Sequence, residues 1–184
     1  MLGVSSSVQP PAAPEDAMRV LVEASDSLSE VFCSLSQRAL RGLLKDPELL
    51  RQVPTDTLQR FSRILLFRDP VNRFGIWLLA WPPGFRTSIH RHHCSCAFGI
   101  YQGQLDEVLY GIGPGGDTVI EVERFTRLAG FVGGAPREHG LVHEMLNVGT
   151  APAVSVHVYA YQPDRYDDSV ERSFVRPPLN ATDD

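Results

Sequence analysis

The stretch from Gly84 to Gly103, GFRTSIHRHHCSCAFGIYQG, gathers three histidines and two cysteines between two glycines. Imidazole nitrogen and thiolate sulfur are common ligands of zinc, copper and iron. Side chains two positions apart on a β-strand point to the same face, so His90 and His92 converge if that face is a barrel interior. For a His-x-His pair alone, a polar patch between neighbouring strands is the alternative. The stretch contains no carboxylate, unlike the two-histidine, one-carboxylate sites of non-haem iron oxygenases.

These residues lie within a region of short apolar runs. From Ile64 to Tyr161 the runs ILLF, FGIWLLAW, CAFGIYQG, LDEVLYGI, TVIEVERF, GFVG, LVHEMLN and AVSVHVYAY are separated by turn sequences such as RDPVN, PPG and GPGGD. A spacing of roughly ten residues per strand and turn is typical of an antiparallel sandwich or barrel. The sequence therefore predicts a mainly β domain around the histidine-rich stretch.

Helical spacing precedes the strands. Between Asp16 and about Gln52, apolar residues recur three and four positions apart, which predicts two to four short helices. Asp46 followed by Pro47 marks the start of one of them, which continues through Leu50.

The chain is long enough for one core and too short for two ordinary domains. Residues 1–15, rich in Pro, Ser and Ala, are expected to be a flexible tail. We expect a single domain over residues 16–184, with a helical part to residue 62 and a barrel over 63–163. The polar C-terminal extension, 164–184, is expected to wrap over the surface or to be disordered.

The composition argues against several classes of function. The net charge is -5 and the arginines are scattered, without a basic stripe, so nucleic acid is not expected as a partner. No apolar run approaches the roughly 20 residues of a membrane-spanning helix, and the first residues lack a signal-peptide pattern, so no membrane association is expected. Three cysteines without disulfide spacing indicate free thiols in a reducing, cytoplasmic protein. The oligomeric state cannot be derived from these features.

The spacing around the histidines resembles the first cupin motif, in which a glycine precedes His-x-His and a glutamate and a second glycine follow. Gly84, His90, His92 and Gly103 fit this frame, but Cys96 stands where the family has its glutamate ligand. The resemblance implies a small antiparallel, jelly-roll-like β-barrel with N-terminal helices. It also implies a metal site without the usual carboxylate.

The third ligand is implied by a second segment. HGLVHEMLN resembles the end of the second cupin motif and implies that His143 completes a site with His90 and His92. His139, four residues earlier and next to a glycine, is the rival and has the character of a loop histidine.

A cupin with cysteine at the glutamate position resembles the thiol dioxygenases typified by cysteine dioxygenase, over about Phe61 to Pro163. AVSVHVYAYQP resembles the strand of that family on which a serine, a histidine and a tyrosine alternate, here Ser155, His157 and Tyr159. The resemblance implies a non-haem Fe(2+) enzyme that converts a small carboxylate-bearing thiol and O2 to a sulfinate. Three neutral imidazoles would leave the ion its full charge, which favours a thiolate and lowers the thiol's pKa.

The substrate anchor is also implied by the resemblance. FSR resembles the family's aromatic-x-Arg, whose arginine binds the substrate carboxylate, and this gives the role to Arg63. An ordinary surface arginine is the alternative, and Arg68 is the rival. A related branch that acts on 3-mercaptopropionate carries glutamine at this place, so the arginine favours L-cysteine.

Cys96 and Tyr159 match the pair that a thioether bond joins in the best-known members. A free buried thiol packed beside a tyrosine is the alternative, and Cys94 shares the strand face of Cys96. Tyr159 is expected to present its hydroxyl to the pocket, with His157 and Ser155 as its supporting hydrogen-bond chain.

Other functions stay open at this point. The substrate can equally be 3-mercaptopropionate or mercaptosuccinate, since each carries a sulfur and a carboxylate. A metal-dependent isomerase or another cupin dioxygenase would more naturally keep the glutamate. A non-catalytic cupin that binds a metal or a small ligand shares the fold, because fold alone does not determine function.

Overall fold

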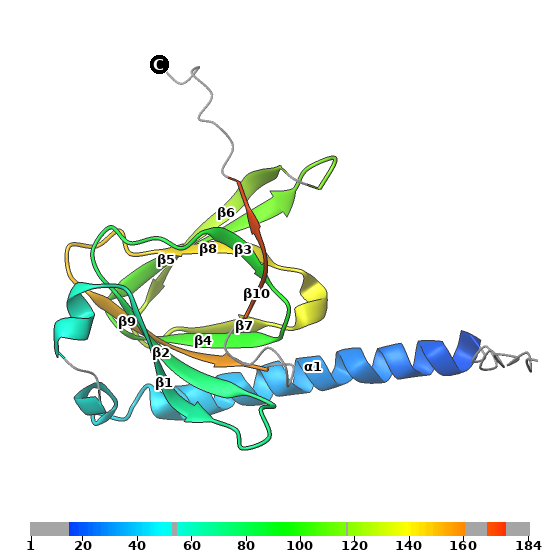
Figure 1. Cartoon of the computed structure of the whole chain (residues 1–184), viewed down its shortest axis with the longest axis horizontal. Coiled ribbons are helices and arrows are strands. Elements are labelled where there is room, and N and C mark those ends of the chain that lie inside the picture. The colour runs from blue at the N-terminus through cyan, green and yellow to red at the C-terminus, as the bar shows by residue number, and fades with distance from the viewer. Residues whose placement is uncertain (1–14, 53–54, 117, 161–168, 176–184) are drawn as a thin grey trace, which may run out of the picture.

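The computed structural model describes residues 15–52, 55–116, 118–160 and 169–175 (Figure 1). Its elements are α1 (Glu15–Leu43), η1 (Leu49–Gln52), η2 (Thr55–Gln59), β1 (Ser62–Arg68), β2 (Gly75–Trp81), β3 (Ile89–His92), β4 (Cys96–Gln102), β5 (Gln104–Ile112), β6 (Val119–Leu128), β7 (Val132–Ala135), η3 (Arg137–His139), β8 (Val142–Leu146), β9 (Ala153–Tyr159) and β10 (Val170–Phe174). The η elements are short 3-10 helices. The expected mainly β class is confirmed.

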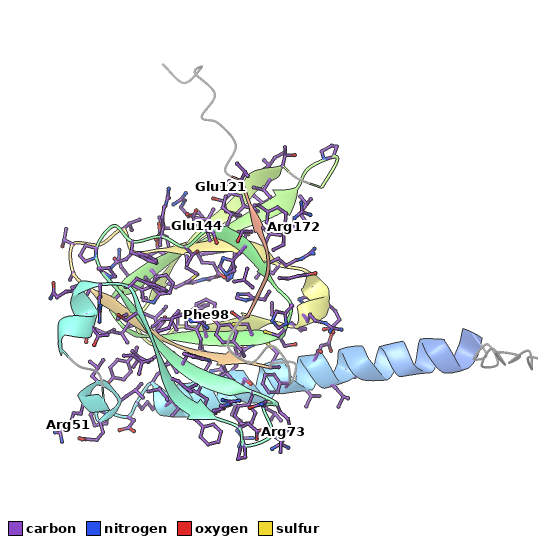
Figure 2. The ribbon with its side chains drawn as sticks, viewed as in Figure 1. Arg51, Arg73, Phe98, Glu121, Glu144 and Arg172 are labelled. Carbon is purple, nitrogen blue, oxygen red and sulfur yellow. The ribbon has the colours of Figure 1, made fainter. Side chains whose placement is uncertain are left out.

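The strands form two antiparallel sheets with the orders β1-β2-β9-β4-β7 and β10-β3-β8-β5-β6. Figure 1 shows the sheets facing each other as the two walls of a small barrel, the architecture expected of a cupin. Figure 2 shows Phe98 inside the barrel, whereas Arg51 and Arg73 lie outside it. The sheets therefore enclose an interior that residues of both can line.

One glycine allows the chain to pass from one sheet to the other. Gly103 lies between β4 and β5, which belong to different sheets, and has a φ of 77°. A Cβ added there would come within 3.0 Å of the Ala153 side chain. The tight turn thus requires the conformational freedom and the small size of glycine, which gives the second glycine of the motif a physical reason.

The strand β9 is buried on both faces. Val154, Val156 and Val158 belong to an apolar cluster with Leu40 of α1 on the outer side of the sheet. The residues that alternate with them, Ser155, His157 and Tyr159, therefore face the barrel interior. Polar groups in such a strand must find hydrogen-bond partners inside the protein.

The helical prediction was wrong in length. The region expected to hold two to four short helices contains η1 and one long helix, α1, of 29 residues, because no glycine or proline interrupts the sequence between Glu15 and Arg41. The predicted start at Asp46 holds locally, since its Oδ1 accepts a hydrogen bond from the Glu48 backbone N–H at 2.9 Å before η1 begins.

The C-terminal extension was only partly foreseen. Residues 169–175 contribute β10, which pairs with β3 and so extends the histidine-bearing sheet. The expected flexible tail, apart from Glu15, lies outside the described residues. None of the described helices is long and apolar enough to cross a membrane.

Candidate metal centre

Three histidines from one sheet converge inside the barrel. His90 and His92 lie on β3, and His143 lies opposite His90 on the neighbouring β8. One nitrogen of each ring lies within 4.8 Å of those of the other two, and the Nε2 atoms of His92 and His143 are 3.2 Å apart. The two-residue alternation on β3 and the register with β8 therefore bring the three imidazoles to one point.

Each imidazole is held through its Nδ1 atom by an oxygen acceptor. The distances are 2.8 Å from His90 to the Ser88 carbonyl and 3.0 Å from His92 to the Ser169 carbonyl. The Nδ1 of His143 lies 3.1 Å from Oε1 of Glu107. Such acceptors place the ring proton on Nδ1 and leave the Nε2 lone pair for a metal.

The protonation states suit metal binding. Burial, followed by the neighbouring His143, lowers the pKa of His90 to about 3. Burial and the same neighbour hold the pKa of His92 well below its ordinary value. Neutral imidazoles are what a metal requires, and three nitrogen ligands suit zinc, copper, iron or nickel. The residues therefore fit a divalent transition metal and leave coordination positions for other ligands.

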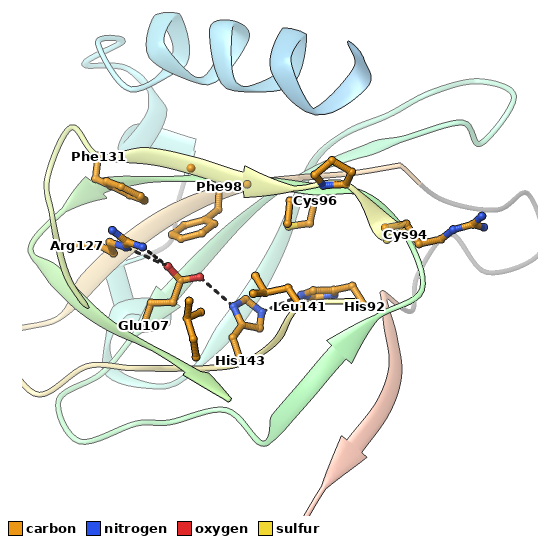
Figure 3. Close-up of a pocket in the computed structure, with 15 residues that line it drawn as sticks. His92, Cys94, Cys96, Phe98, Glu107, Arg127, Phe131, Leu141 and His143 are labelled. Carbon is orange, nitrogen blue, oxygen red and sulfur yellow. Dashed lines mark hydrogen bonds and ion pairs between the residues drawn. The ribbon is translucent and has the colours of Figure 1, made fainter. Parts of the chain in front are cut away.

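Glu107 supports the metal-binding group and was not foreseen from the sequence. It lies on β5, its side chain is buried, and its Oε2 accepts hydrogen bonds from Nε and Nη2 of Arg127 at 3.0 and 2.8 Å. Burial alone would raise the pKa of Glu107, but the hydrogen bonds from His143 and Arg127 outweigh it and lower that pKa. Glu107 is therefore a buried carboxylate that orients His143 (Figure 3). The only sequence signal was a charge within an apolar strand.

We expect Glu107→Gln to weaken metal binding by about 10–100-fold, the usual effect of losing a group that orients a ligating histidine. A neutral amide orients the imidazole less strongly and leaves the Arg127 guanidinium without a charged partner. The measurement is the dissociation constant for Co(2+) or Fe(2+) from competition with a chelator. Glu121→Gln, in the exposed pair with Arg124, is the matched control. Equal affinities in the two variants would exclude this role.

A chain of hydrogen bonds runs along β9 on the facing sheet. The Trp81 Nε1–H donates to Ser155 Oγ at 2.8 Å, Ser155 Oγ lies 2.8 Å from His157 Nε2, and His157 Nδ1 lies 3.1 Å from the Tyr159 hydroxyl. Burial, followed by the charges of His143 and Arg63, lowers the pKa of His157 to about 3, so its ring is neutral.

The donor directions follow from Trp81, whose indole nitrogen can only donate. If Ser155 accepts from Trp81 and donates to His157 Nε2, then His157 Nδ1–H donates to the Tyr159 oxygen. The opposite tautomer would leave the buried Ser155 hydroxyl proton without an acceptor among the described residues. In this series of hydrogen bonds the Tyr159 oxygen accepts from His157, so the hydroxyl proton of Tyr159 points away from His157 and can be donated to another group.

Cys96 and Tyr159 are direct neighbours on paired strands. They lie opposite each other in the register of β4 and β9, and together with Cys94 they form a buried cluster against which Trp77 packs. Burial, with smaller contributions from Cys94 and other nearby groups, raises the pKa of Cys96 well above its ordinary value. The Cys96 sulfur is therefore a protonated thiol beside the Tyr159 ring.

The cavity between the sheets has a volume of about 350 Å³. His92, His143, Cys94 and Cys96 line it together with apolar side chains (Figure 3), namely those of Phe98, Leu109, Phe131 and Leu141. A small polar ligand that reaches the histidines thus has mostly apolar surroundings.

The expected substrate anchor, Arg63, lies beside the cluster of Cys94, Cys96 and Tyr159, and it is not among the residues that line the cavity. Its guanidinium carbon is 4.7 Å from the centre of the Trp77 ring, on the exposed edge strand β1. Arg127 and Arg137 line the cavity, but Arg127 is bound to Glu107. The rival Arg68 is exposed and donates to Asn72 at the end of β1.

The rival ligand His139 lies in η3. Its side chain is exposed, and it does not belong to the group of three histidines.

The chain is similar to known proteins in sequence. Residues 54–169 match the family model of cysteine dioxygenase type I. Cysteine dioxygenase type 1 of Danio rerio is 32% identical over 113 residues, 55% of this chain and 51% of that protein. The match thus spans about half the length of that relative.

Two solved structures share low sequence identity with the chain. A Cupin 2 conserved barrel domain protein from Salinispora arenicola has a TM-score of 0.44 at 21% identity, covering 59% of this chain and 83% of that one. The protein TT1209 from Thermus thermophilus has a TM-score of 0.44 at 22% identity, covering 60% of this chain and 92% of that one.

Proposed function

Because the chain belongs to the cysteine dioxygenase type I family, we propose that it is a non-haem Fe(2+) thiol dioxygenase that converts L-cysteine and O2 to the sulfinate. One observation carries this proposal. The three convergent imidazoles of one sheet face the Cys96–Tyr159 pair of the other, and the ring centres of His92 and Tyr159 are 5.5 Å apart. A metal-binding cupin without catalysis has no need for the tyrosine and its hydrogen-bonded support.

The proposed reaction needs no reduced cofactor. Both atoms of O2 enter the sulfinate, so the substrate sulfur supplies all the electrons. Bound at His90, His92 and His143, Fe(2+) would lower the pKa of the substrate thiol and hold the thiol and O2 next to each other. Glu107 supplies a buried negative charge behind His143, which would partly balance the charge of the ion.

Tyr159 is proposed to act as a hydrogen-bond donor to the substrate. The donor chain from Trp81 through Ser155 and His157 fixes the orientation of its hydroxyl. Because these groups are buried and already oriented, little reorganisation is needed when charge develops on the substrate. Cys96 restrains the ring from the neighbouring strand.

Arg63 is proposed to bind the substrate carboxylate, and we expect Arg63→Ala to raise KM for cysteine by more than about tenfold. Loss of a charge-assisted pair costs about 2–5 kcal/mol when the pair is desolvated. Tenfold, about 1.4 kcal/mol, lies below that range because Arg63 is exposed on β1. Its position over Trp77, which contacts the Cys96–Tyr159 cluster, supports this role. Steady-state kinetics compares KM for cysteine in the variant and the wild type, with the metal content measured on the same samples.

Arg68→Ala is the matched control, because Arg68 is exposed on the same strand and donates to Asn72, four positions along the chain. Its KM should equal that of the wild type. Turnover of cysteamine, a thiol without a carboxylate, at the wild-type rate for cysteine would contradict the anchor role.

A dicarboxylate thiol is the second candidate substrate, because Arg137 also lines the cavity. Its ion pair with Glu138 is long, 3.5 Å, and its side chain is half exposed. Arg137 could therefore bind a second carboxylate such as that of mercaptosuccinate.

Oxygen consumption by the iron-loaded protein tests the function. Cysteine, 3-mercaptopropionate and mercaptosuccinate are compared at equal concentration, and the product is identified by mass spectrometry. Sulfinate formed fastest from cysteine supports the proposal, and a preference for mercaptosuccinate supports the role of Arg137. If no thiol stimulates oxygen uptake, the protein is a binding cupin instead.

A further inference from the structure

The ion pair of Glu107 and Arg127 lies beside His143. Arg127, on the edge strand β6, donates from Nε and Nη2 to one carboxylate oxygen, Oε2, at 3.0 and 2.8 Å. The other oxygen, Oε1, lies 3.1 Å from Nδ1 of His143. Figure 3 shows the carboxylate of Glu107 bridging the two groups. Because each oxygen serves a different partner, the guanidinium helps to set the direction in which Oε1 points.

The guanidinium of Arg127 is also held by two aromatic rings. Its central carbon lies 4.1 Å from the centre of the Phe125 ring and 4.3 Å from that of the Phe131 ring. Only 20% of the Arg127 side chain is exposed, and only 5% of the Glu107 side chain. Arginine stacks on aromatic faces and presents a rigid fork of donors, whereas lysine presents a hydrated point charge. These surroundings therefore suit a guanidinium specifically, and not any positive charge.

Phe131 is fixed in turn by the facing sheet. Its ring centre lies 5.6 Å from that of Phe98 on β4, and Phe98 stacks on His157 of β9 at 5.5 Å. A Cβ added at Gly133 would come within 2.7 Å of the Phe131 Cζ atom, so this glycine leaves room for the ring. Residues of both sheets thus hold Arg127 in place.

A second arginine of β6 forms an ordinary surface ion pair. The side chain of Arg124 is 41% exposed, its Nη2 lies 3.1 Å from Glu121, and its Nη1 lies 3.6 Å from Asp106. Exposed pairs of this kind contribute little to stability, and a buried pair is also weak evidence for stability because its desolvation is costly. The enclosed position of Arg127 therefore calls for another reason, and the contact of Glu107 with a metal-binding histidine supplies one.

We propose that Arg127 is a positioning residue of the metal centre, which keeps Oε1 of Glu107 against His143 and so leaves Nε2 of His143 for the ion. This inference rests on the metal centre of the proposed function, but it does not depend on thiol oxidation. A positive charge near the site would by itself repel the ion. Positioning and charge therefore predict opposite changes in metal affinity when the guanidinium is removed.

Competition between the full chain and a chelator for Co(2+) tests the proposal. Arg127→Met should raise the dissociation constant about three- to tenfold, less than the 10–100-fold typical of a group in direct contact with a ligating histidine. A buried carboxylate oxygen without its donors is costly, so Glu107 would turn toward other donors and no longer hold His143. Arg124→Met, on the same strand, is the matched control and should bind Co(2+) like the wild type. Unchanged or tighter binding by Arg127→Met would overturn the proposal.

Arg127→Lys separates the fork of donors from the charge. It keeps the positive charge but has neither the fork nor the flat face that stacks on the rings, so it should also bind Co(2+) more weakly than the wild type. Wild-type affinity in this variant would show that charge is sufficient, and the positioning role would then be wrong. The lysine variant also decides the question if Arg127→Met does not fold.

The tautomer of His143 provides a readout that needs no metal. In the metal-free chain labelled with ¹⁵N-histidine, NMR should show His143 protonated at Nδ1 in the wild type and in Arg124→Met, and a mixture of tautomers in Arg127→Met. An ion pair that only stabilises the fold would leave this ratio unchanged in a variant whose circular dichroism shows it to be folded. An unchanged ratio would therefore overturn the proposal.

Failure of this inference can be told apart from failure of the proposed function. A wild type that binds no Co(2+) would contradict the metal centre and, with it, the role of Arg127. A wild type that binds Co(2+), loses affinity on removal of Arg127 and oxidises no thiol when loaded with iron would contradict the proposed reaction alone.

Discussion

Replacing His92 with alanine is expected to remove bound metal and thiol-dependent oxygen uptake together. His92 supplies one of three convergent nitrogens, and its Nε2 lies 3.2 Å from that of His143. Two remaining imidazoles cannot hold a divalent transition metal at the usual coordination number for protein ligands. Metal content after gel filtration, measured by inductively coupled plasma mass spectrometry, is the direct readout. An oxygen electrode measures the second quantity, the thiol-dependent oxygen uptake.

His139→Ala is the matched control, because His139 is exposed in η3 and was the rival ligand. This variant should keep both metal and activity. Full metal occupancy in the His92 variant would show that His92 is not a ligand. Metal loss in the His139 variant would show that His139 is a ligand.

Tyr159→Phe is expected to slow turnover by about a hundredfold while the metal stays bound, since one oriented hydrogen-bond donor at developing charge is worth about 10²–10³ in rate. The substitution removes the hydroxyl at the end of the chain from Trp81 through Ser155 and His157. It keeps the ring that packs beside Cys96. The measurement is kcat for each thiol, with metal content determined on the same sample.

Two further variants separate the hydroxyl from its surroundings. Tyr101→Phe removes another tyrosine hydroxyl, which donates to the Asp46 carbonyl near the helix, and should leave kcat unchanged. Cys96→Ser should keep a measurable fraction of activity, because a group that restrains the ring contributes less than the hydroxyl itself. A full rate for Tyr159→Phe on every thiol would show that the hydroxyl takes no part in the reaction.

The strands and the inward face of β9 could be predicted from the sequence because alternation is a local property. Each apolar run between turn sequences became a strand, and the interior position of Ser155, His157 and Tyr159 follows from the period of two. The length of α1 could not be predicted in the same way, because the recurrence of apolar residues at three and four positions indicates a helix but not where that helix ends.

The groups that hold the imidazoles could not be predicted in the same way. Glu107 and His143 are 36 positions apart and meet only through the pairing of β5 with β8. The acceptors of His90 and His92 are backbone carbonyls, and every residue has one. Residue type therefore carries no information about which carbonyl will serve.

The strand β10 connects the metal centre with a segment that is synthesised after the three histidines. The carbonyl that holds His92 belongs to Ser169, next to the strand that pairs with β3. During synthesis, the three histidines leave the ribosome well before this residue does. The acceptor for His92 Nδ1 is therefore added only when Ser169 lies beside β3. Tight metal binding would then depend on β10, which is synthesised after all three histidines.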